Sequence, residues 1–598
     1  MQKRFFSALL FVIVAATNAG PHAAEPRSQR STRHGHAKLD KYLQHVDRDA
    51  SSSDAVRVIV RTRKGAGEKV KFALAESDDT VVQEHQSIDA LSAEVRVAKL
   101  RAIAERDDVI SVSVDAPVHA GADLVGTLAD NELLPTLGLR ANTDVGKDVG
   151  VAVLDSGIVN HDQIPVVAFY DFVNKGGAKI KQYDDYGHGT HVAGVIKNKD
   201  DKSDARYRSV AHGSSLIGMK VLAADGSGYT STVIKAIEFA IVNKSQLKID
   251  VINLSLGHPI YESAATDPLV QAVERAVAAG IVVVVAAGNE GMNRQTGEVG
   301  YAGITSPGNA PSAISVGAVD TKGTVTRSDD QVAPFSSRGP SWYDGYAKPD
   351  VVAPGRHVVS FMAKDSYLHR RYPQWTATAA TRTYMALSGT SMATAVATGV
   401  VADIIRASRS ASGGKSPTPN TVKAILEFTA VQIPNADVLT QGAGSINANG
   451  AIVLASAIDT RTPVSSPWLV SGVIPTTTLS NGEVMNWGQH IVWGDHVVWG
   501  DHIYFNEPAW ALHLVWGDHV VWGDHIVWGD HVVWGDALVW GEHLVWGENV
   551  LAYDANGTLL YGNQINWRNV TAEHLVWGSL DATLTALGVS MTFWTPVF

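Results

Sequence analysis

The chain has 598 residues, enough for several domains, and its 45% hydrophobic and 18% charged residues are typical of a folded protein. The formal net charge of -11 argues against nucleic acid as a partner, because proteins that bind a phosphate backbone carry an excess of basic residues. The chain has no cysteine, which excludes disulfides, thiol catalysis and thiolate metal sites.

The N-terminus has the pattern of a secretory signal peptide over residues 1–24. Lys3 and Arg4 precede an apolar run over residues 5–16, and small residues follow up to Ala24. We therefore expect a secreted protein, either extracellular or in the cell envelope. Neither this run nor any later one reaches spanning length, so no transmembrane segment is expected. Residues 25–54 are polar and rich in Ser, Arg and His, which predicts a linker.

A compact α+β module is predicted over residues 55–118. The alternation in "AVRVIVRTR" (Ala55–Arg63) predicts a strand, and so does "DDVISVSVD" (Asp107–Asp115). Between them, "VAKLRAIAER" (Val97–Arg106) has apolar residues at helical spacing.

Residues 130–457 alternate between apolar strands and amphipathic helices. The strands "DVINLSLG" (Asp250–Gly257) and "IVVVVAAGN" (Ile281–Asn289) alternate with helical stretches such as "STVIKAIEFAIV" (Ser231–Val242). This pattern predicts an α/β fold with a mostly parallel sheet and helices on both faces. Functional residues of such sheets lie at the carboxyl ends of the strands.

Three short stretches supply the groups of a nucleophilic serine site. Asp155 ends an apolar strand, His188 lies in "GHGTHVAG", and Ser391 lies in "LSGTSMATA". A serine hydroxyl needs a base within hydrogen-bond reach, and the base needs an anion that holds its tautomer. Asn289, in "AAGNEG", follows another strand and offers an amide donor for the oxyanion, as would the backbone N–H groups of a helix starting at Ser391.

These stretches, in the order Asp, His, Ser, resemble those of the subtilisin-like serine peptidases, the subtilases. Further blocks match in the same order: "GMKVLAADGSG", "VINLSLG", "PSAISVGAVD", "FSSRGP", "KPDVVAPG" and "GAGSINANGA". The resemblance covers about residues 130–457 and implies a serine-type endopeptidase that hydrolyses peptide bonds of protein or peptide substrates through an acyl-enzyme. An inactive protease scaffold within a surface adhesion or structural protein is the alternative.

The resemblance assigns roles residue by residue. Ser391 is the expected nucleophile, His188 the general base and then acid, Asp155 the group that orients His188, and Asn289 the oxyanion donor. The expected substrate-binding residues are the strand residues that pair with the substrate and two residues that line the specificity pocket: Ser255, Leu256, Gly257, Ala287 and Gly288. We expect Thr305 near the base of that pocket, where it would narrow it.

The resemblance also gives the module at residues 55–118 a role. It is similar to the inhibitor-like propeptide of subtilases, which implies a self-processing proenzyme whose own propeptide is an intramolecular inhibitor. The cut is expected within His119–Glu132. A permanent accessory domain is the alternative.

Two features depart from the family pattern. Ala395 stands where subtilases have a proline, and Tyr367–Arg382 is an insertion that matches no family block and could shape the cleft. No cofactor is expected to be required. A structural calcium ion remains an unplaced expectation, because Asp200, Asp201 and Asp204 lie in a charged loop that does not match the family's calcium loop.

Three polar residues near His188 have alternative interpretations. Asp184 and Asp185 could ligate a metal or lie in a solvated loop, and the solvated loop is our prediction. His191 lies three residues after His188 on nearly the same helix face, and a structural role is predicted for it rather than a catalytic one.

A tryptophan repeat fills the C-terminal residues 458–598. Tryptophan recurs every six residues at positions 487, 493 and 499 and, after an interruption, at positions 516, 522, 528, 534, 540 and 546. Because six is even, an extended chain would place every tryptophan on one face, which predicts a β-rich domain such as a β-solenoid. Metal binding through pairs such as Asp495–His496, and binding of carbohydrate or a surface through an aromatic face, are the alternatives.

Overall fold

The computed structural model describes residues 36–48, 54–77, 79–121, 123–124, 133–139, 146–198, 207–293, 296–379, 382–458, 473–493, 496–499, 531–534, 537–540, 551–553 and 559–561. The expected signal peptide, the charged loop with Asp200, Asp201 and Asp204, and most of the C-terminal tail lie outside these residues.

The module predicted over residues 55–118 is a four-stranded antiparallel sheet with strand order β2-β3-β1-β4. Its strands are β1 (Ala55–Thr62), β2 (Thr80–His85), β3 (Ala90–Arg96) and β4 (Val109–Val114). Helices α2 (Gly67–Glu76) and α3 (Leu100–Glu105) share a hydrophobic core with Val58 and Val60 on one face of the sheet. On the opposite face, Ile59 joins a second core that is built mainly by the following domain.

Part of the predicted linker is folded onto this module. Leu39 forms a parallel bridge with Val112 of β4, and helix α1 (Lys41–Arg48) follows at once. Leu39 and Leu43 are buried because they lie four residues apart, on one side of the short helix and its start. The linker predicted over residues 25–54 therefore does not extend over residues 36–48, whose polar composition concealed this apolar spacing.

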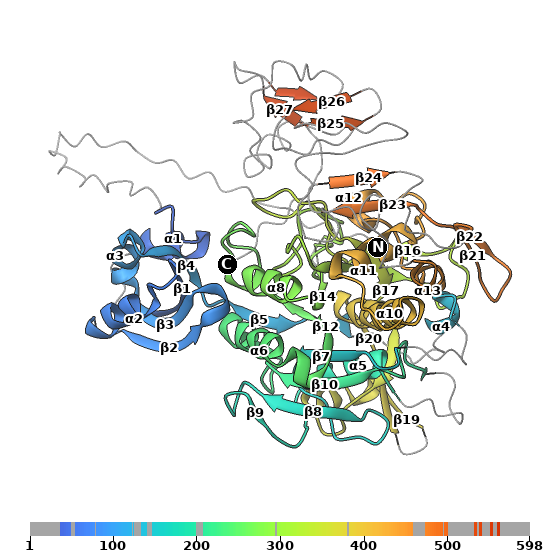
Figure 1. Cartoon of the computed structure of the whole chain (residues 1–598), viewed down its shortest axis with the longest axis horizontal. Helices are drawn as coiled ribbons and strands as arrows, with labels where there is room; N and C mark the ends of the chain where they lie inside the picture. Colours follow the sequence, from blue (N-terminus) through green and yellow to red (C-terminus); the bar gives the residue numbers. More distant parts are fainter. Residues whose placement is uncertain are drawn as a thin grey trace, which may run out of the picture. The chain divides into compact units, whose positions relative to one another are not determined.

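The large domain is built on a nine-stranded sheet with the order β16-β15-β14-β12-β7-β10-β8-β9, in which β17 pairs with β15 (Figure 1). The strands that pair in parallel are β7 (Gly150–Asp155), β8 (Val166–Asp171), β10 (Ser215–Lys220), β12 (Ile249–Leu254), β14 (Val282–Ala286), β15 (Ile314–Asp320) and β17 (Val351–Pro354). Two-residue strands β9 (Ala178–Lys179) and β16 (Gln331–Val332) add antiparallel pairs. The prediction of a mostly parallel sheet is confirmed.

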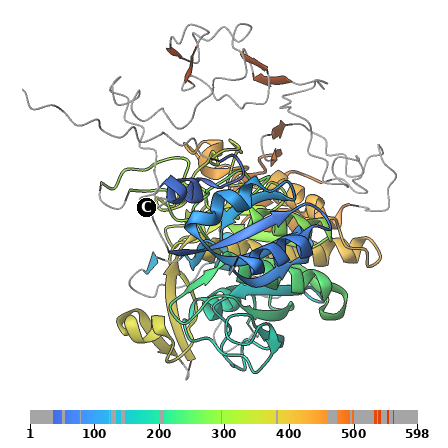
Figure 2. The ribbon, with the colours of Figure 1, turned by 90° about the vertical axis from the view of Figure 1, so that its left-hand side faces the viewer.

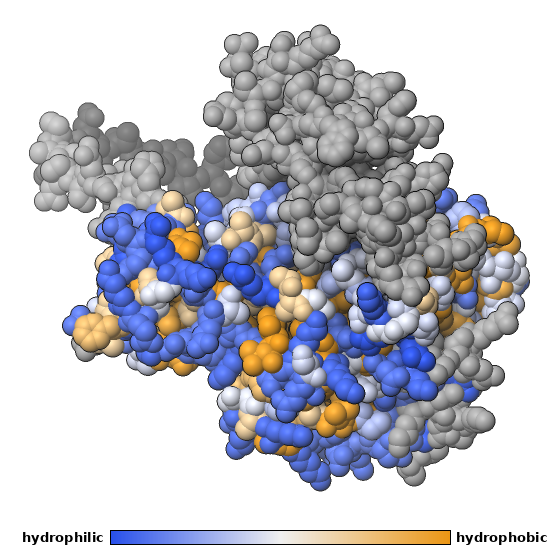
Figure 3. Space-filling model, viewed as in Figure 1, coloured by the Kyte–Doolittle hydropathy of each residue, from blue (hydrophilic) through white to orange (hydrophobic). Residues whose placement is uncertain are grey.

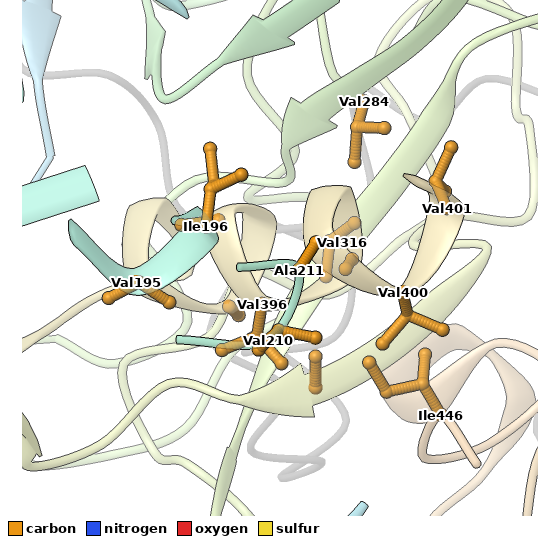
Figure 4. Packing of buried hydrophobic residues seen from close by; sticks show 14 of the residues in the cluster. Val195, Ile196, Val210, Ala211, Val284, Val316, Val396, Val400, Val401 and Ile446 are labelled. Atoms are coloured by element: carbon orange, nitrogen blue, oxygen red, sulfur yellow. The ribbon is translucent and has the colours of Figure 1, made fainter. Parts of the chain in front are cut away.

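Helices cover both faces of this sheet, as the continuous apolar strands require. One core contains α5 (His188–Ile196), α10 (Thr390–Ala411), α11 (Pro419–Phe428) and α13 (Ala448–Ser456). The other contains α6 (Thr230–Val242) and α8 (Pro268–Ala278). The alternation within β7 divides its residues between the two cores, with Val151 and Val153 in the first and Ala152 and Leu154 in the second. Figure 4 shows the first core between the sheet, α5 and α10.

Two smaller sheets flank the central one. Strand β5 (Pro117–Ala120) lies between β11 (Ser227–Tyr229) and β13 (Leu256–Gly257). Strand β20 (Arg382–Ser388) pairs with β18 (Val358–Phe361), with β19 (Thr376–Ala379) and with the two-residue strand β6 (Asp123–Leu124). The insertion predicted at Tyr367–Arg382 forms α9 (Tyr367–Arg371), one turn of 3-10 helix over Pro373–Trp375, and β19. The remaining short helices are α4 (Leu133–Thr136), α7 (Lys244–Leu247) and α12 (Val438–Gln441).

The packed body continues past residue 457, where the sequence predicts its end. The hairpin β21 (Thr476–Thr478) and β22 (Val484–Asn486) leads to Trp487, which is buried in the core that contains α11 and α13. Trp487 is the first tryptophan of the six-residue series, and the structure makes it part of the large domain.

Later repeats contain short paired strands where the structure describes them. β23 (His490–Trp493) pairs antiparallel with β24 (His496–Trp499), and β25 (His531–Trp534) pairs in the same way with β26 (Ala537–Trp540). A third hairpin joins β27 (Leu551–Tyr553) and β28 (Leu559–Tyr561). Successive hexads thus pair strand against strand, whereas the predicted solenoid stays a prediction.

Within the described ranges, no helix is both long and apolar enough to cross a membrane. On the face shown in Figure 3, hydrophobic residues form small separate patches among hydrophilic ones.

Candidate active site

Asp155 and His188 meet at the carboxyl end of the central sheet. Asp155 is the last residue of β7 and His188 the first of α5, and both side chains are buried. The Nδ1 atom of His188 lies 2.8 Å from Oδ1 and 3.0 Å from Oδ2 of Asp155. The carboxylate therefore fixes a ring whose Nδ1 is protonated, so that Nε2 is the basic nitrogen. Among the described residues, no group forms a hydrogen bond with that Nε2.

Ser391 is the second residue of α10 and is buried at the same edge. Its hydroxyl donates to the carbonyl oxygen of Ser255 at 3.0 Å, and the hydroxyl of Ser255 donates to the carbonyl of Ser391 at 3.0 Å. The expected hydrogen-bonded row is thus present between Asp155 and His188, whereas the Ser391 hydroxyl is directed toward Ser255. Rotation about one side-chain bond reorients a serine hydroxyl, and catalytic hydrogen bonds often form only with substrate in place.

Asn289 lies just beyond β14 with its amide oriented by the start of α10. Its Oδ1 accepts hydrogen bonds from the N–H of Thr390 at 2.9 Å and from the Thr390 hydroxyl at 3.1 Å. Because the oxygen is used in this way, Nδ2 is the atom presented to the cleft. A Cβ placed on Gly121 would lie 2.6 Å from this Nδ2 and 3.7 Å from the Ser391 hydroxyl oxygen.

A segment of the chain itself therefore runs through the site. In β5, Ala120 pairs with Leu256, and His119 pairs with Gly257 and with Ser227. After Gly121, β6 pairs Asp123 with Ser388 and Leu124 with Leu387 of β20. The predicted binding strand at Leu256 and Gly257 is thus occupied by an antiparallel strand, the arrangement by which extended peptides are held at a sheet edge.

A cavity of about 620 Å³ opens beside Ser391 and Asn289. Ala286, Gly288 and Thr305 line this cavity. The side chain of Thr305 lies against Gly257 and Gly288, since a Cβ on either glycine would come within 2.9 Å of it. Ala287, predicted to bind substrate, is instead buried behind the wall, where its carbonyl accepts the N–H of Thr305 at 3.0 Å. Neighbouring residues of an extended segment face opposite sides, which explains the difference.

Asp184 has a role that the sequence did not reveal. Its buried carboxylate accepts hydrogen bonds from the hydroxyls of Ser156 and Thr190 and from the N–H groups of Gly187 and Thr190, at 2.6–2.9 Å. Burial raises the pKa of Asp184, and the hydroxyl of Thr190 counteracts this. Asp184 thus links the loop after Asp155 to the start of α5, so the prediction of a solvated loop is wrong for this residue. The sequence feature that could have indicated this role is an acidic residue six positions before a threonine in "DDYGHGT".

Two other polar residues near the site are structural. His191 is buried, and its Nε2 lies 3.1 Å from the carbonyl of Val358 and 3.0 Å from that of Met385, where only a ring N–H can bond. Burial lowers the pKa of His191 to about 3. Asp185 pairs with the buried Nζ of Lys220 at 2.6 Å. In the part of the chain that the structure describes, no group of His, Asp and Glu side chains is arranged so that it could hold a metal ion.

The departures from the family pattern lie around Asp155, His188 and Ser391 rather than at these residues. Ala395 lies within the unbroken helix α10, in keeping with the helix propensity of alanine. The insertion contacts the loop before His188: Tyr367 stacks on Tyr186 with ring centroids 5.7 Å apart, and the N–H of Leu368 donates to the carbonyl of Tyr186 at 3.0 Å.

Known proteins are similar to this chain in sequence and in architecture. The model of the subtilase family matches residues 146–451. Serine protease AprX from Bacillus subtilis is 36% identical over 375 residues, which are 61% of this chain and 79% of that protein. Subtilisin E, also from Bacillus subtilis, is 34% identical over 64% of this chain and 86% of its own length.

A solved structure shares the fold. Fervidolysin from Fervidobacterium pennivorans, described as a keratinolytic enzyme related to subtilisin, aligns with a TM-score of 0.53 and 23% identity over 71% of this chain and 63% of its own. The order of the sequence blocks and these similarities agree. The chain belongs to the subtilase family and is a subtilisin-like serine endopeptidase that acts on peptide substrates.

Proposed function

We propose that the protein is a secreted, self-processing proenzyme in which Asp155, His188 and Ser391 form the catalytic triad. The observation that carries this proposal is the course of residues 117–124 through the site, with Gly121 beside Ser391 and Asn289. The signal-peptide pattern of residues 1–24 supports export.

In the proposed reaction, the Ser391 hydroxyl turns from Ser255 toward Nε2 of His188 and attacks the carbonyl carbon of the scissile bond. His188 takes the hydroxyl proton and passes it to the leaving amine, while Asp155 stabilises the imidazolium. Nδ2 of Asn289 donates to the oxyanion together with backbone N–H groups at the start of α10. Water then enters by the same general-base route and releases the acyl group from Ser391.

The first substrate is proposed to be the chain itself, cut between Gly121 and Ala122. Pairing on both sides of Gly121, with β13 before it and β20 after it, supports this bond within the expected range His119–Glu132. Residues 36–121, here called the prosegment, would remain in the cleft after the cut as an inhibitor.

The prosegment, which lies in front of the large domain in the view of Figure 2, contacts that domain through more than β5. Asp115 accepts hydrogen bonds from the N–H and hydroxyl of Ser231 at the start of α6, both at 2.8 Å. Farther along α6, Glu238 accepts the N–H of Ser87 at 2.8 Å. A segment bound to the cleft and to a helix beside it suits an inhibitor better than a permanent accessory domain.

The test is Ser391→Ala in the full chain, with Ser410→Ala, an exposed serine on the same helix, as the matched control. Wild type and control should react with a fluorophosphonate and yield a mature chain that begins at Ala122. Ser391→Ala should stay unlabelled and retain residues 36–121. Labelling of Ser391→Ala would contradict the nucleophile, and a labelled wild type that keeps its prosegment would favour the accessory domain.

A further inference from the structure

The segment His36–Arg48, here called the leg, is the first part of the prosegment and is anchored on the rest of it. The N–H of Asp40 donates to the carbonyl of Val112 in β4 at 3.1 Å, and Nζ of Lys38 donates to the carbonyl of Arg106 at 2.7 Å. Leu43 is fully buried in the prosegment core. The leg therefore moves with the prosegment.

The opposite side of the leg contacts the large domain. The N–H of Lys41 donates to the carbonyl of Tyr261 at 3.1 Å, and the rings of Tyr42 and Tyr261 lie with centroids 5.8 Å apart. Tyr261 in turn stacks on His258 with an interplanar angle of 10°. Both residues belong to the loop His258–Asp267, which joins β13 to α8 and is here called the rim loop.

The rim loop forms part of the wall of the cavity beside Ser391. Besides Ser391 and Asn289, this cavity is lined by His258 and Tyr261 of the rim loop and by Lys41 of the leg. Since α1 begins at Lys41, the first helical residue of the leg lies at the outer edge of the proposed substrate pocket. The prosegment thus covers the site twice, with β5 in the cleft and the leg at this edge.

The residue in the cleft explains why a second contact matters. Gly121, the prosegment residue beside Ser391, has no side chain of its own to place in the cavity, which His119 and Ala120 only line. Strand β5 has only four residues, of which two pair with β13 and three pair with β11. Contacts elsewhere add to the affinity of this short strand for the cleft, because linked contacts strengthen each other by raising the local concentration.

We propose that the leg is a second inhibitory clamp, which holds the rim loop and slows release of the prosegment after the cut. This inference rests on the proposed function, because it assigns a kinetic role to one part of the inhibitor. The clamp acts through two contacts, the hydrogen bond from Lys41 to Tyr261 and the packing of Tyr42 on Tyr261.

The test is the double variant Lys41→Pro/Tyr42→Ala in the full chain. Proline is well tolerated at the first position of a helix, so it removes the N–H that bonds Tyr261 and leaves α1 formed. After the cut, the variant should develop peptidase activity on dilution about ten times faster than wild type, since one hydrogen bond and one aromatic contact are lost. His45→Ala, exposed on the same helix, is the matched control and should behave like wild type. Equal rates for all three proteins would overturn the proposal.

A second measurement does not depend on activity. In full chains that carry Ser391→Ala, the double variant should show faster amide hydrogen exchange in the rim loop than the parent, whereas unchanged exchange would overturn the clamp. Failure of the proposed function would look different: the wild-type chain would neither cut itself nor gain activity, although the leg still protected the rim loop.

Discussion

Individual residues of this site are held by partners that lie far away in the chain. In the chain, β8 and β9 separate Asp155 from Asp184, yet the hydroxyl of Ser156, next to Asp155, donates to Asp184. The hydroxyl oxygen of Ser156 also accepts the N–H of Gly189 at 2.9 Å. The loop after β7 and the start of α5 therefore move as one unit. Such coupling keeps the carboxylate and the imidazole in register, which a serine peptidase requires.

Asn289 permits a test of the oxyanion donor. Asn289→Leu removes Nδ2 and should lower kcat by about 10²–10³ with little change in KM, the loss known for the equivalent amide in subtilisin, because the hydrogen bond forms mainly in the transition state. Steady-state kinetics on a peptide substrate measures both constants.

Asn289→Asp is the companion variant, because it keeps the oxygen that accepts from Thr390 and replaces the donor with a negatively charged oxygen. It should be at least as impaired as Asn289→Leu. Activity close to wild type in Asn289→Asp would show that orientation of Thr390, rather than donation to the oxyanion, is what Asn289 provides.

At the scale of elements, α10 connects the site to the core. The helix is 22 residues long, and its residues from Thr390 to Ile405 are buried between the sheet, α5 and α13. Ser391 is thus placed by a helix packed on nearly all sides, and fixed packing is what pre-organises a nucleophile. Figure 4 shows Val396 of α10 beside Val210 and Val400 of α10 beside Ile446.

The segment after α13 stabilises the same core through Trp487. Its ring packs against Phe428 of α11 with centroids 6.5 Å apart, and its Nε1 donates to the hydroxyl of Thr477 at 2.9 Å. Trp487→Ala should lower the free energy of unfolding by about 3–5 kcal/mol, because it leaves a cavity and removes the hydrogen bond to Thr477. Thermal or denaturant unfolding of the Ser391→Ala background, which avoids self-digestion, measures the change.

Trp375→Ala is the matched control, because Trp375 is only half-buried and lies in the insertion. Trp375→Ala should lower the free energy of unfolding clearly less than Trp487→Ala does. If both variants unfold at the wild-type midpoint, Trp487 belongs with the tail and not with the core.

At the scale of the whole molecule, acidic groups meet where the prosegment and the large domain join. Burial, then the charge of Asp267, raises the pKa of Asp40 in the leg to about 7 and that of Glu262 in the rim loop to about 8. Other titratable groups that interact with these two carboxylates or with Asp267 are Arg61, Tyr261, Tyr343 and Asp344. Arg275 and Asp89 act in turn on Arg61, and Tyr42 acts on Tyr261.

These shifts predict that the prosegment is held more tightly at low pH. Both carboxyl groups bind protons more strongly in the joined state than when water reaches them, so the joined state gains protons as the pH falls. Raising the pH from about 4.5 to 8 should therefore weaken binding, by at most about tenfold per pH unit for each group, with no further change above both pKa values. The rate at which cut enzyme gains activity, normalised to fully released enzyme at each pH, measures this.

Glu262→Gln should flatten the pH profile, because an amide carries no charge to bury. The matched control is Glu76→Gln on the exposed side of α2, which should keep the wild-type profile. A profile for Glu262→Gln as steep as that of wild type would contradict the assignment.

The sequence by itself determined the family, the order of the strands and helices and the residue types of the proposed triad. These features are recorded in contiguous blocks. β7 ends at Asp155, as the apolar run predicts, His188 and His191 lie on one helix, α5, and α10 begins at Thr390, one residue before the predicted start at Ser391. Local patterns suffice here because an apolar period reports which face of an element is buried.

Only the tertiary structure decided which partners those faces and polar groups meet. The burial of Asp184, the docking of the leg on Tyr261, the packing of Trp487 and the withdrawal of Ala287 behind the pocket wall all depend on residues distant in the chain. A spacing pattern shows that a side chain will be buried, but the group that buries it is set by how the sheets and helices pack.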